Sequence, residues 1–274
     1  MLEILIPVLV LVVIALLCAV LLTVSSVFFG VKEDERVMQV RDCLPGANCG
    51  ACGFSGCDGY AKALGDGTTD KATLCVPGGD GVAREIAEIM GLAAGDVVER
   101  VAYVACNGSC LPSERKYQYD GPKSCVAANQ IWSGDRDCTF ACLGYGDCVK
   151  VCPRDAICIN EKKGIAEIDP RKCIGCGLCV KTCPNSIIHL INDTERVVVK
   201  CSSHDKGAQV RKVCSNGCIG CGKCERSCPE GAIKVDNNLA VIDYDKCTGC
   251  GTCHDVCPVK CIHAGNFICG SHFE

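Results

Sequence analysis

Cysteines recur along this chain at the intervals that proteins use to hold iron–sulfur clusters. Thirty of the 274 residues are cysteine, and three stretches have the spacing C-x2-C-x2-C-x3-C followed by proline, over residues 173–184, 218–229 and 247–258. Bacterial ferredoxins bind [4Fe-4S] clusters with this spacing, and the fourth cysteine of each run ligates the neighbouring cluster. Because a cubane requires four thiolates directed at one centre, the repeats predict a chain that carries electrons through several clusters.

Two further cysteine groups depart from that spacing. Residues 138–153 read C-x3-C-x5-C-x3-C-P, which we interpret as a stretched ferredoxin run that keeps four thiolates and the final Cys-Pro. Nearer the N-terminus, residues 49–57 read C-x2-C-x4-C within a glycine-rich loop, and Cys75 follows. Glycine lets the backbone bend tightly and approach the sulfurs, as a cluster-wrapping loop requires.

The spacing and the ferredoxin crossover rule together predict five [4Fe-4S] clusters and their ligands. The expected sets are Cys49, Cys52, Cys57 and Cys75 for the first site; Cys138, Cys142, Cys148 and Cys183 for the second; Cys152, Cys173, Cys176 and Cys179 for the third; Cys218, Cys221, Cys224 and Cys257 for the fourth; and Cys228, Cys247, Cys250 and Cys253 for the fifth.

Ten cysteines lie outside these five sets, and some of them suggest a sixth cluster. Cys106, Cys110 and Cys125 are close enough in sequence to supply three ligands, and Cys201 or Cys214 would be the fourth through space.

The other remaining thiols are expected to have no ligand role. Cys158 and Cys261 each follow a Cys-Pro pair in an apolar setting, where a buried free thiol is the ordinary outcome. Cys18 lies within a long apolar segment and is interpreted as a small apolar residue.

Other cysteine chemistries fit the pattern less well. A disulfide framework suits short secreted proteins, whereas no cleavable export signal is visible here. Four-cysteine zinc sites also use paired C-x2-C, but they rarely need three thiolates at this interval plus Cys-Pro. The sequence C-G-T-C-H over residues 250–254 matches the haem-attachment motif, although both of its cysteines belong to a ferredoxin run.

The N-terminal segment has the composition of a membrane span. No charged residue occurs from Ile4 to Val31, and such a length exceeds the roughly 30 Å hydrocarbon core when it is helical. A cleavable signal would need a basic start, but only Glu3 precedes the segment. Basic residues follow the span, so the positive-inside rule predicts a single pass through the cytoplasmic membrane with the cluster domains on the cytoplasmic side.

These features predict an α+β chain made of one transmembrane helix, a small [4Fe-4S] domain and two tandem bacterial-type 2[4Fe-4S] ferredoxin domains. The expected divisions are an anchor at 1–31, a [4Fe-4S] domain at 32–100, a cysteine-containing connector at 101–130, a first ferredoxin-like domain at 131–194, a linker at 195–214, a second ferredoxin-like domain at 215–268 and a tail at 269–274. The basic side chains of the linker suggest either a docking face for an acidic redox partner or a solvated connection.

Local patterns predict several elements. Residues 165–168 and 187–191 are expected to be strands, and residues 232–243 a hairpin with an Asp-Asn-Asn turn. A helix from Gly81 to Met90 is expected to be capped by Asp80 and ended by Gly91. Large apolar side chains are few, so we expect the clusters to take the place of a hydrophobic core and the apo-protein to fold poorly.

The combined features of the chain resemble the RnfB component of the Rnf electron-transport complex. They are an apolar N-terminal span, tandem ferredoxin runs, and the motif GANCGACGFSGC at 46–57 with the later Cys75-Val-Pro-Gly-Gly. The resemblance covers essentially the whole chain and is closest to the longer, cluster-rich form of the family. It implies an electron-relay component of an ion-translocating ferredoxin:NAD+ oxidoreductase. Reduced ferredoxin would be the donor, the other Rnf subunits and membrane lipid the partners, and Na+ or H+ the transported ion.

The sequence lacks motifs for the rest of the reaction, which agrees with the role of an electron relay. The chain has no dinucleotide or flavin fingerprint, and a single span cannot form an ion path, so NAD chemistry and transport are expected on partner subunits. We expect no nucleic-acid partner. Two alternatives are a membrane-anchored polyferredoxin of a different oxidoreductase and a zinc-holding scaffold without redox chemistry.

Overall fold

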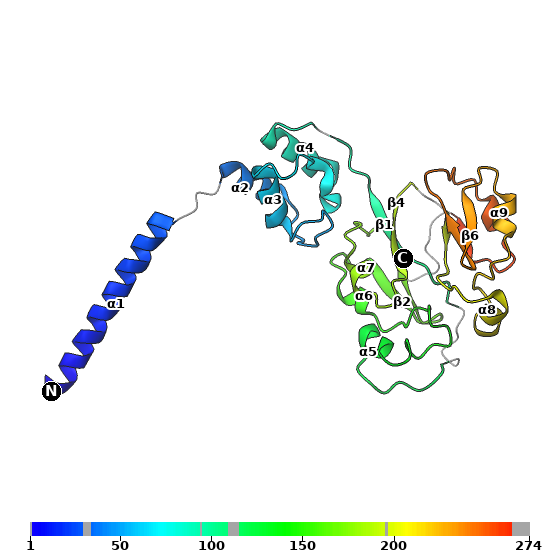
Figure 1. The fold of residues 1–274 in the computed structure, drawn as a ribbon, viewed down its shortest axis with the longest axis horizontal. Coiled ribbons are helices and arrows are strands. Elements are labelled where there is room, and N and C mark those ends of the chain that lie inside the picture. The colour runs from blue at the N-terminus through cyan, green and yellow to red at the C-terminus, as the bar shows by residue number, and fades with distance from the viewer. Residues whose placement is uncertain (1, 30–33, 94, 109–114, 195–196, 265–274) are drawn as a thin grey trace.

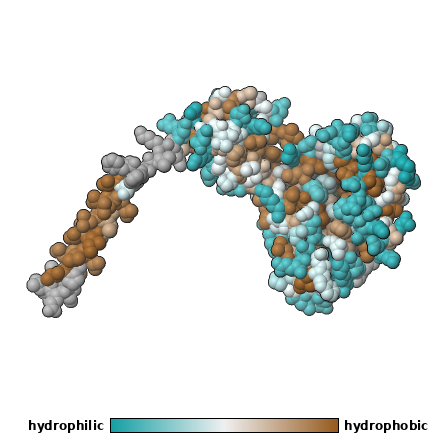
Figure 2. All heavy atoms as spheres, viewed as in Figure 1, coloured by the Kyte–Doolittle hydropathy of each residue, from teal (hydrophilic) through white to brown (hydrophobic). Residues whose placement is uncertain are grey.

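A single long helix stands apart from the cysteine-rich part of the molecule. The computed structural model describes residues 2–29, 34–93, 95–108, 115–194 and 197–264. Helix α1 (Leu2–Phe29) extends away from the other elements (Figure 1), and Figure 2 shows apolar surface over the middle part of the helix. Its segment Val8–Ser25 has a mean hydropathy of 3.2 and buries nothing against the rest of the chain. Length and composition therefore suit a membrane span, as the sequence predicts.

The first cysteine-bearing domain is a small helical fold. Its elements are α2 (Glu35–Cys43), α3 (Cys57–Gly65), the 3-10 turns η1 (Ala72–Leu74) and η2 (Val76–Gly78), and α4 (Gly79–Met90). Val40, Tyr60 and Ile86 are fully buried at its centre. Gly91 ends α4 in the left-handed conformation, as expected.

The expected start of α4 is wrong. The helix begins at Gly79, and its N-cap is Gly78, which makes no side-chain capping bond. Asp80 lies in the first turn instead, where its carboxylate accepts a hydrogen bond of 2.7 Å from the Val97 amide. The aspartate thus ties the following segment back to the helix rather than capping it.

The next unit is built from two antiparallel strand pairs. Strands β2 (Ile157–Asn160) and β3 (Ile165–Ile168) pair with each other, and β1 (Arg100–Val104) pairs with β4 (Ile188–Asn192). Short helices α5 (Cys125–Asn129), α6 (Asp147–Lys150) and α7 (Leu178–Thr182) each carry a cysteine, and α6 and α7 pack against β2 and β4. The strand at 165–168 is confirmed, and the one expected at 187–191 is shifted by a single residue.

The second unit repeats this arrangement. Strand β6 (Ile233–Asp236) pairs with β7 (Leu239–Ile242), and β5 (Val197–Val199) pairs with β8 (Ile262–Ala264). Its helices are α8 (Gly207–Val213), α9 (Lys223–Ser227) and α10 (Thr252–Asp255). The expected hairpin at 232–243 is confirmed, and Asn237 and Asn238 form its turn with positive φ.

Two segments expected to be connections contribute strands. All of β1 but Arg100 comes from the expected connector, and β5 comes from the expected linker. Each pairs with the last strand of its unit. The three valines of β5 and Lys200 are buried, so the prediction of a solvated connection is wrong for residues 197–200. The sequence pattern missed β1 because residues 100–104 are far from β4 along the chain.

Candidate iron–sulfur sites

The four cysteines expected at the first site lie around one cavity. The thiols of Cys49, Cys52, Cys57 and Cys75 line it together with Tyr60. Burial raises the pKa of Cys75 to about 11, and the three other thiols add to the rise because each disfavours a second negative charge nearby. A bound iron cluster would supply the positive charge that this group of thiolates requires.

The third expected set also comes together. Burial raises the pKa of Cys179 to about 12, and the neighbouring thiols that add to it are Cys173, Cys176 and Cys152. Helix α7 carries Cys179, and the loop before it carries Cys173 and Cys176. Cys152 comes from the preceding half of the unit, as the crossover rule expects.

The two sites of the second unit follow the same geometry. Cys228, Cys247, Cys250 and Cys253 line one cavity between β6 and α10. Cys218 and Cys224 belong to a single buried cluster, and the partly buried Cys257 packs against it. Cys221 adds to the rise in the pKa of Cys224 that burial causes. Cys221 and Cys250 are the exposed members of these two sets, so this unit places one ligand of each site at the surface.

The second expected set is only partly assembled. Cys142 and Cys148 pack in one core, with Cys183 at its edge. Burial raises the pKa of Cys148 to about 12, and the thiol that adds most to the rise is Cys125, ahead of Cys179 and Cys183. Cys138 is absent from that group of neighbours and lines a different cavity, with Cys106, Cys201 and Cys214.

The sixth expected set divides in the same way. Cys106 lies in the cavity that Cys201 and Cys214 line, whereas Cys125 is a neighbour of Cys148. Cys110 falls outside the described residues. Cys201 and Cys214, which the sequence offers as alternatives for the fourth ligand of the sixth site, both line the same cavity.

Backbone amides donate to the sulfurs at several of these sites. The amides of Ala156, Ala166 and Ala232 lie 3.3 Å from the Sγ atoms of Cys152, Cys142 and Cys228. The amide of Ala102, on β1, lies 3.4 Å from Cys173 Sγ. Such bonds orient the ligands and stabilise negative charge on a cluster, which raises its reduction potential.

Two cysteines outside the expected sets, Cys158 and Cys261, have different surroundings. Cys158 is half-buried on β2, where burial raises its pKa and the charged neighbours that act on it are Glu167 and Lys172. Cys261 is buried, and its sulfur lies 3.7 Å from Cys257 Sγ. The sequence shows Cys261 only as a leftover cysteine, so this contact with an expected ligand is visible only in three dimensions.

Four thiolates can bind either a single ion or a cluster. Among the described residues, no three His, Cys, Asp or Glu side chains converge closely enough to hold one metal ion. A zinc site draws four ligands to a single atom at about 2.3 Å for sulfur, whereas each thiolate of a cubane meets a different iron. Cysteine sets that surround a cavity, with amides directed at the sulfurs, fit the second arrangement.

These observations define a ferredoxin-type iron–sulfur electron carrier with several clusters and an apolar helix at one end. Sequence families agree with this class: 4Fe-4S dicluster domains match residues 137–187, 172–233 and 211–264, and a family described as a putative Fe-S cluster matches residues 44–77. The match at 172–233 joins the second half of one unit to the first half of the next, so the repeating element is half a unit.

Characterised relatives narrow the class to one family. The B component of the Na(+)-translocating ferredoxin:NAD(+) oxidoreductase complex of Acetobacterium woodii is 45% identical over 89% of this chain and 73% of its own length. The proton-translocating counterpart of Clostridium ljungdahlii is 44% identical over 84% and 81%. The B component of the ion-translocating oxidoreductase complex of Methanosarcina acetivorans is 38% identical over 83% and 85%. The chain belongs to this family, the RnfB family of ion-translocating oxidoreductase components.

Proposed function

We propose that this chain takes electrons from reduced ferredoxin and passes them along its [4Fe-4S] clusters to partner subunits of an ion-translocating ferredoxin:NAD+ oxidoreductase. The RnfB relatives are named as subunits of such complexes, and the matched iron–sulfur domains fit an electron relay. NAD+ reduction and the movement of Na+ or H+ are assigned to partners in this proposal, because the chain carries neither a dinucleotide fingerprint nor several spans.

The observation that carries the proposal is the adjacency of successive cysteine sets. Cys49 of the first site is close enough to Cys176 of the third to add to the rise in its pKa that burial causes. The Lys181 ammonium donates to the Cys49 carbonyl at 3.3 Å and ties the two domains together at that point. Clusters at these two sites would therefore be neighbours, as a relay requires.

Within each site the protein's own contribution is to hold and tune a cluster. In this proposal the ligand sets of the first, third, fourth and fifth sites each hold one [4Fe-4S] cubane, which accepts and releases one electron at a time when bound. The amide donors favour the reduced form.

The apolar helix gives the relay its location. In this proposal α1 crosses the cytoplasmic membrane once and keeps the cluster domains on the cytoplasmic side, where reduced ferredoxin is present. Arg36 and Arg41, beyond the span, agree with that orientation, although Asp34 pairs with Arg36 and reduces the net charge.

The test is ferredoxin oxidation by the purified complex with and without this chain. We expect loss of ferredoxin-dependent NAD+ reduction when the chain is omitted, and a loss of similar extent with Cys75→Ala at the first site. Cys43→Ala is the matched control, since that thiol also lies in the first domain but outside the expected ligand set. Ferredoxin oxidation at full rate without the chain would refute the proposal.

A further inference from the structure

We propose that Cys138 ligates a sixth [4Fe-4S] cluster together with Cys106, Cys201 and Cys214, and that Cys125 takes its place as the fourth ligand of the second site. The inference rests on the proposed function, in which the cysteine sets hold clusters. It changes the expected ligands of the second site to Cys125, Cys142, Cys148 and Cys183. The sixth site then lies between the two ferredoxin-like units.

The register of the cysteine runs places Cys138 outside the run that follows it. Residues 142–148 read C-L-G-Y-G-D-C, against C-I-G-C-G-L-C at 173–179 and C-I-G-C-G-K-C at 218–224. The run is therefore not stretched. It is a regular run in which Tyr145 occupies the position of the second cysteine, and Cys138 lies before its first ligand.

The backbone supports this register. In the three runs the glycines at the third and fifth positions all have positive φ, between 63° and 82°. The fifth-position glycine is the N-cap of the following helix in each, at Gly146, Gly177 and Gly222. Because only glycine adopts this conformation without strain, the coincidence at two positions fixes the alignment.

Contacts with the adjacent hairpins agree. The first cysteine of the run, Cys142, accepts a hydrogen bond from the Ala166 amide on β3, and its counterpart Cys218 accepts one from Ala240 on β7. A Cβ added at Gly144 would clash with the Gly164 carbonyl oxygen in the β2–β3 turn. One added at Gly220 would meet the matching β6–β7 turn. Cys142 is thus the first ligand, not the second.

Tyr145 leaves the second site one thiolate short, and Cys125 is placed to supply it. The Tyr145 hydroxyl donates to Asp135 at 2.8 Å and accepts from Arg115 at 2.9 Å, so it is already engaged. Cys125 is buried at the start of α5, beside Leu143 and Tyr145. It is also the thiol that acts most strongly on the pKa of Cys148, after the effect of burial itself.

The four remaining thiols surround their own cavity. Cys106, Cys138, Cys201 and Cys214 line a small space of about 30 Å³ that the buried Val210 of α8 closes. Burial raises the pKa of Cys138 to about 12, and the neighbouring thiols that add to this are the other three. A set of four thiols drawn from the connector, the first unit and the expected linker fits a cubane ligand set.

Amide donors point at these sulfurs as they do at the other sites. Cys201 Sγ accepts from the Cys218 amide at 3.3 Å and from the Ser203 amide at 3.5 Å. Backbone hydrogen bonds from Cys142 and Gly108 oppose the rise that burial causes in the pKa of Cys106. This many backbone amide donors suits thiolate ligands better than free thiols in an apolar core.

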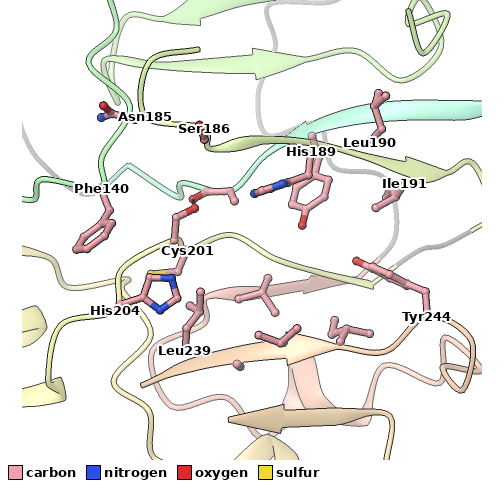
Figure 3. A pocket seen from close by; sticks show the side chains of 17 residues that line it. Phe140, Asn185, Ser186, His189, Leu190, Ile191, Cys201, His204, Leu239 and Tyr244 are labelled. Carbon is pink, nitrogen blue, oxygen red and sulfur yellow. Dashed lines mark hydrogen bonds between the residues drawn. The ribbon is translucent and has the colours of Figure 1, made fainter. Parts of the chain in front are cut away.

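The position of the cavity gives the sixth cluster a role. Cys106 contacts the backbone of Cys142, a ligand of the second site, and Cys201 contacts that of Cys218, a ligand of the fourth. Figure 3 shows Cys201 between the Phe140 and His189 side of the first unit and the Leu239 side of the second, in a neighbouring cleft of about 540 Å³. An electron leaving the second site would pass through the sixth cluster to the fourth.

The experiment is iron and acid-labile sulfide per chain in the anaerobically purified full-length protein and in alanine variants. Each cluster accounts for about four iron atoms. We expect Cys138→Ala and Cys106→Ala each to lose about four, and the double variant to lose no more. Cys138→Ala with Cys142→Ala should lose about eight, because the two ligands serve different clusters. A loss of about four from that second pair would overturn the inference.

A rescue variant separates ligation from folding. Cys125→Ala should lose the second cluster, and adding Tyr145→Cys should restore both the iron and the corresponding EPR signal of the reduced protein. Cys158→Ala is the control and should keep the full iron content. Failure of the rescue while Cys158→Ala stays loaded would contradict the role of Cys125.

The outcomes distinguish this inference from the proposed function. About twenty iron atoms in the wild type, unchanged in Cys106→Ala and Cys214→Ala, would overturn the sixth cluster and leave a five-cluster relay intact. Zinc in place of iron, with no sulfide, would overturn both.

Discussion

Replacing Cys261 by alanine should lower the reduction potential of the fourth cluster. Cys261 is 1% exposed, and its Sγ lies 3.7 Å from that of Cys257, an expected ligand of this cluster. When Cys257 is bound as thiolate, only Cys261 carries a proton, so its S–H donates to the ligand sulfur. The same bond holds the pKa of Cys257 down to about 5. Alanine occupies the matching position after two of the three other Cys-Pro pairs, at Ala156 and Ala232, and Ile187 occupies the third, so a side chain without sulfur suits this position.

The size of the shift follows from the strength of one weak hydrogen bond. A thiol is a weak donor, and a net contribution of about 0.5–1 kcal/mol is reasonable. For a one-electron couple, 59 mV corresponds to a tenfold change in equilibrium constant, so the expected shift is about 20–40 mV toward more negative potential. The added electron increases the charge on the cluster, and loss of a donor therefore disfavours the reduced form.

The assay is an EPR-monitored redox titration of the full-length protein. Cys158→Ala, which removes a half-buried thiol of β2 outside the expected ligand sets, should leave every potential unchanged. A Cys261→Ala protein with full iron content whose fourth cluster keeps its potential, or moves to a more positive one, would refute the reasoning.

Three further outcomes follow from the structure. Deletion of residues 1–31 should release the chain from membrane vesicles without changing iron per chain, and a truncated chain that stays in the vesicle pellet would contradict the anchor. Burial lowers the pKa of His263 to about 4, below the ordinary value of 6.5. Between these values the unfolded state binds a proton that the folded state does not, so stability should fall as pH drops from about 6.5 toward 4. Thermal melts of His263→Gln should show a smaller loss of stability over this pH range. Asp135→Asn should lower the stability by about 1–3 kcal/mol, because the carboxylate is fully buried and pairs with Arg115 and Tyr145; an unchanged melting temperature would argue against that network.

Local patterns in the sequence predict most of the fold near the regular cysteine runs. The strand at 165–168 and the hairpin at 232–243 follow from alternating apolar residues around turn residues, and these signals are short-range. β1 and β5 are not predictable in this way, because each pairs with a strand far along the chain. Asp80 has the residue type of a cap, but its carboxylate bonds instead to Val97, which lies beyond the helix.

The candidate sites show the same limit. Spacing alone indicates the sets in which three cysteines lie in one loop and the fourth comes from the other half of the unit. An example is Cys152 with the three cysteines of residues 173–179. It fails where ligands come from separate segments, since nothing in the sequence brings Cys201 next to Cys106 or Cys125 next to Cys148. A signal was nevertheless present in the repeats: C-L-G-Y-G-D-C aligns with its counterparts once the glycines, and not only the cysteines, are compared.

The measurement that tests the central claim most directly is a reductive titration of the anaerobically purified chain, with iron, sulfide and zinc measured on the same sample. We predict about twenty-four iron atoms with matching sulfide and an uptake of about six electrons, one for each [4Fe-4S] cluster. A protein that contains zinc, lacks sulfide and takes up no electrons would contradict the relay altogether.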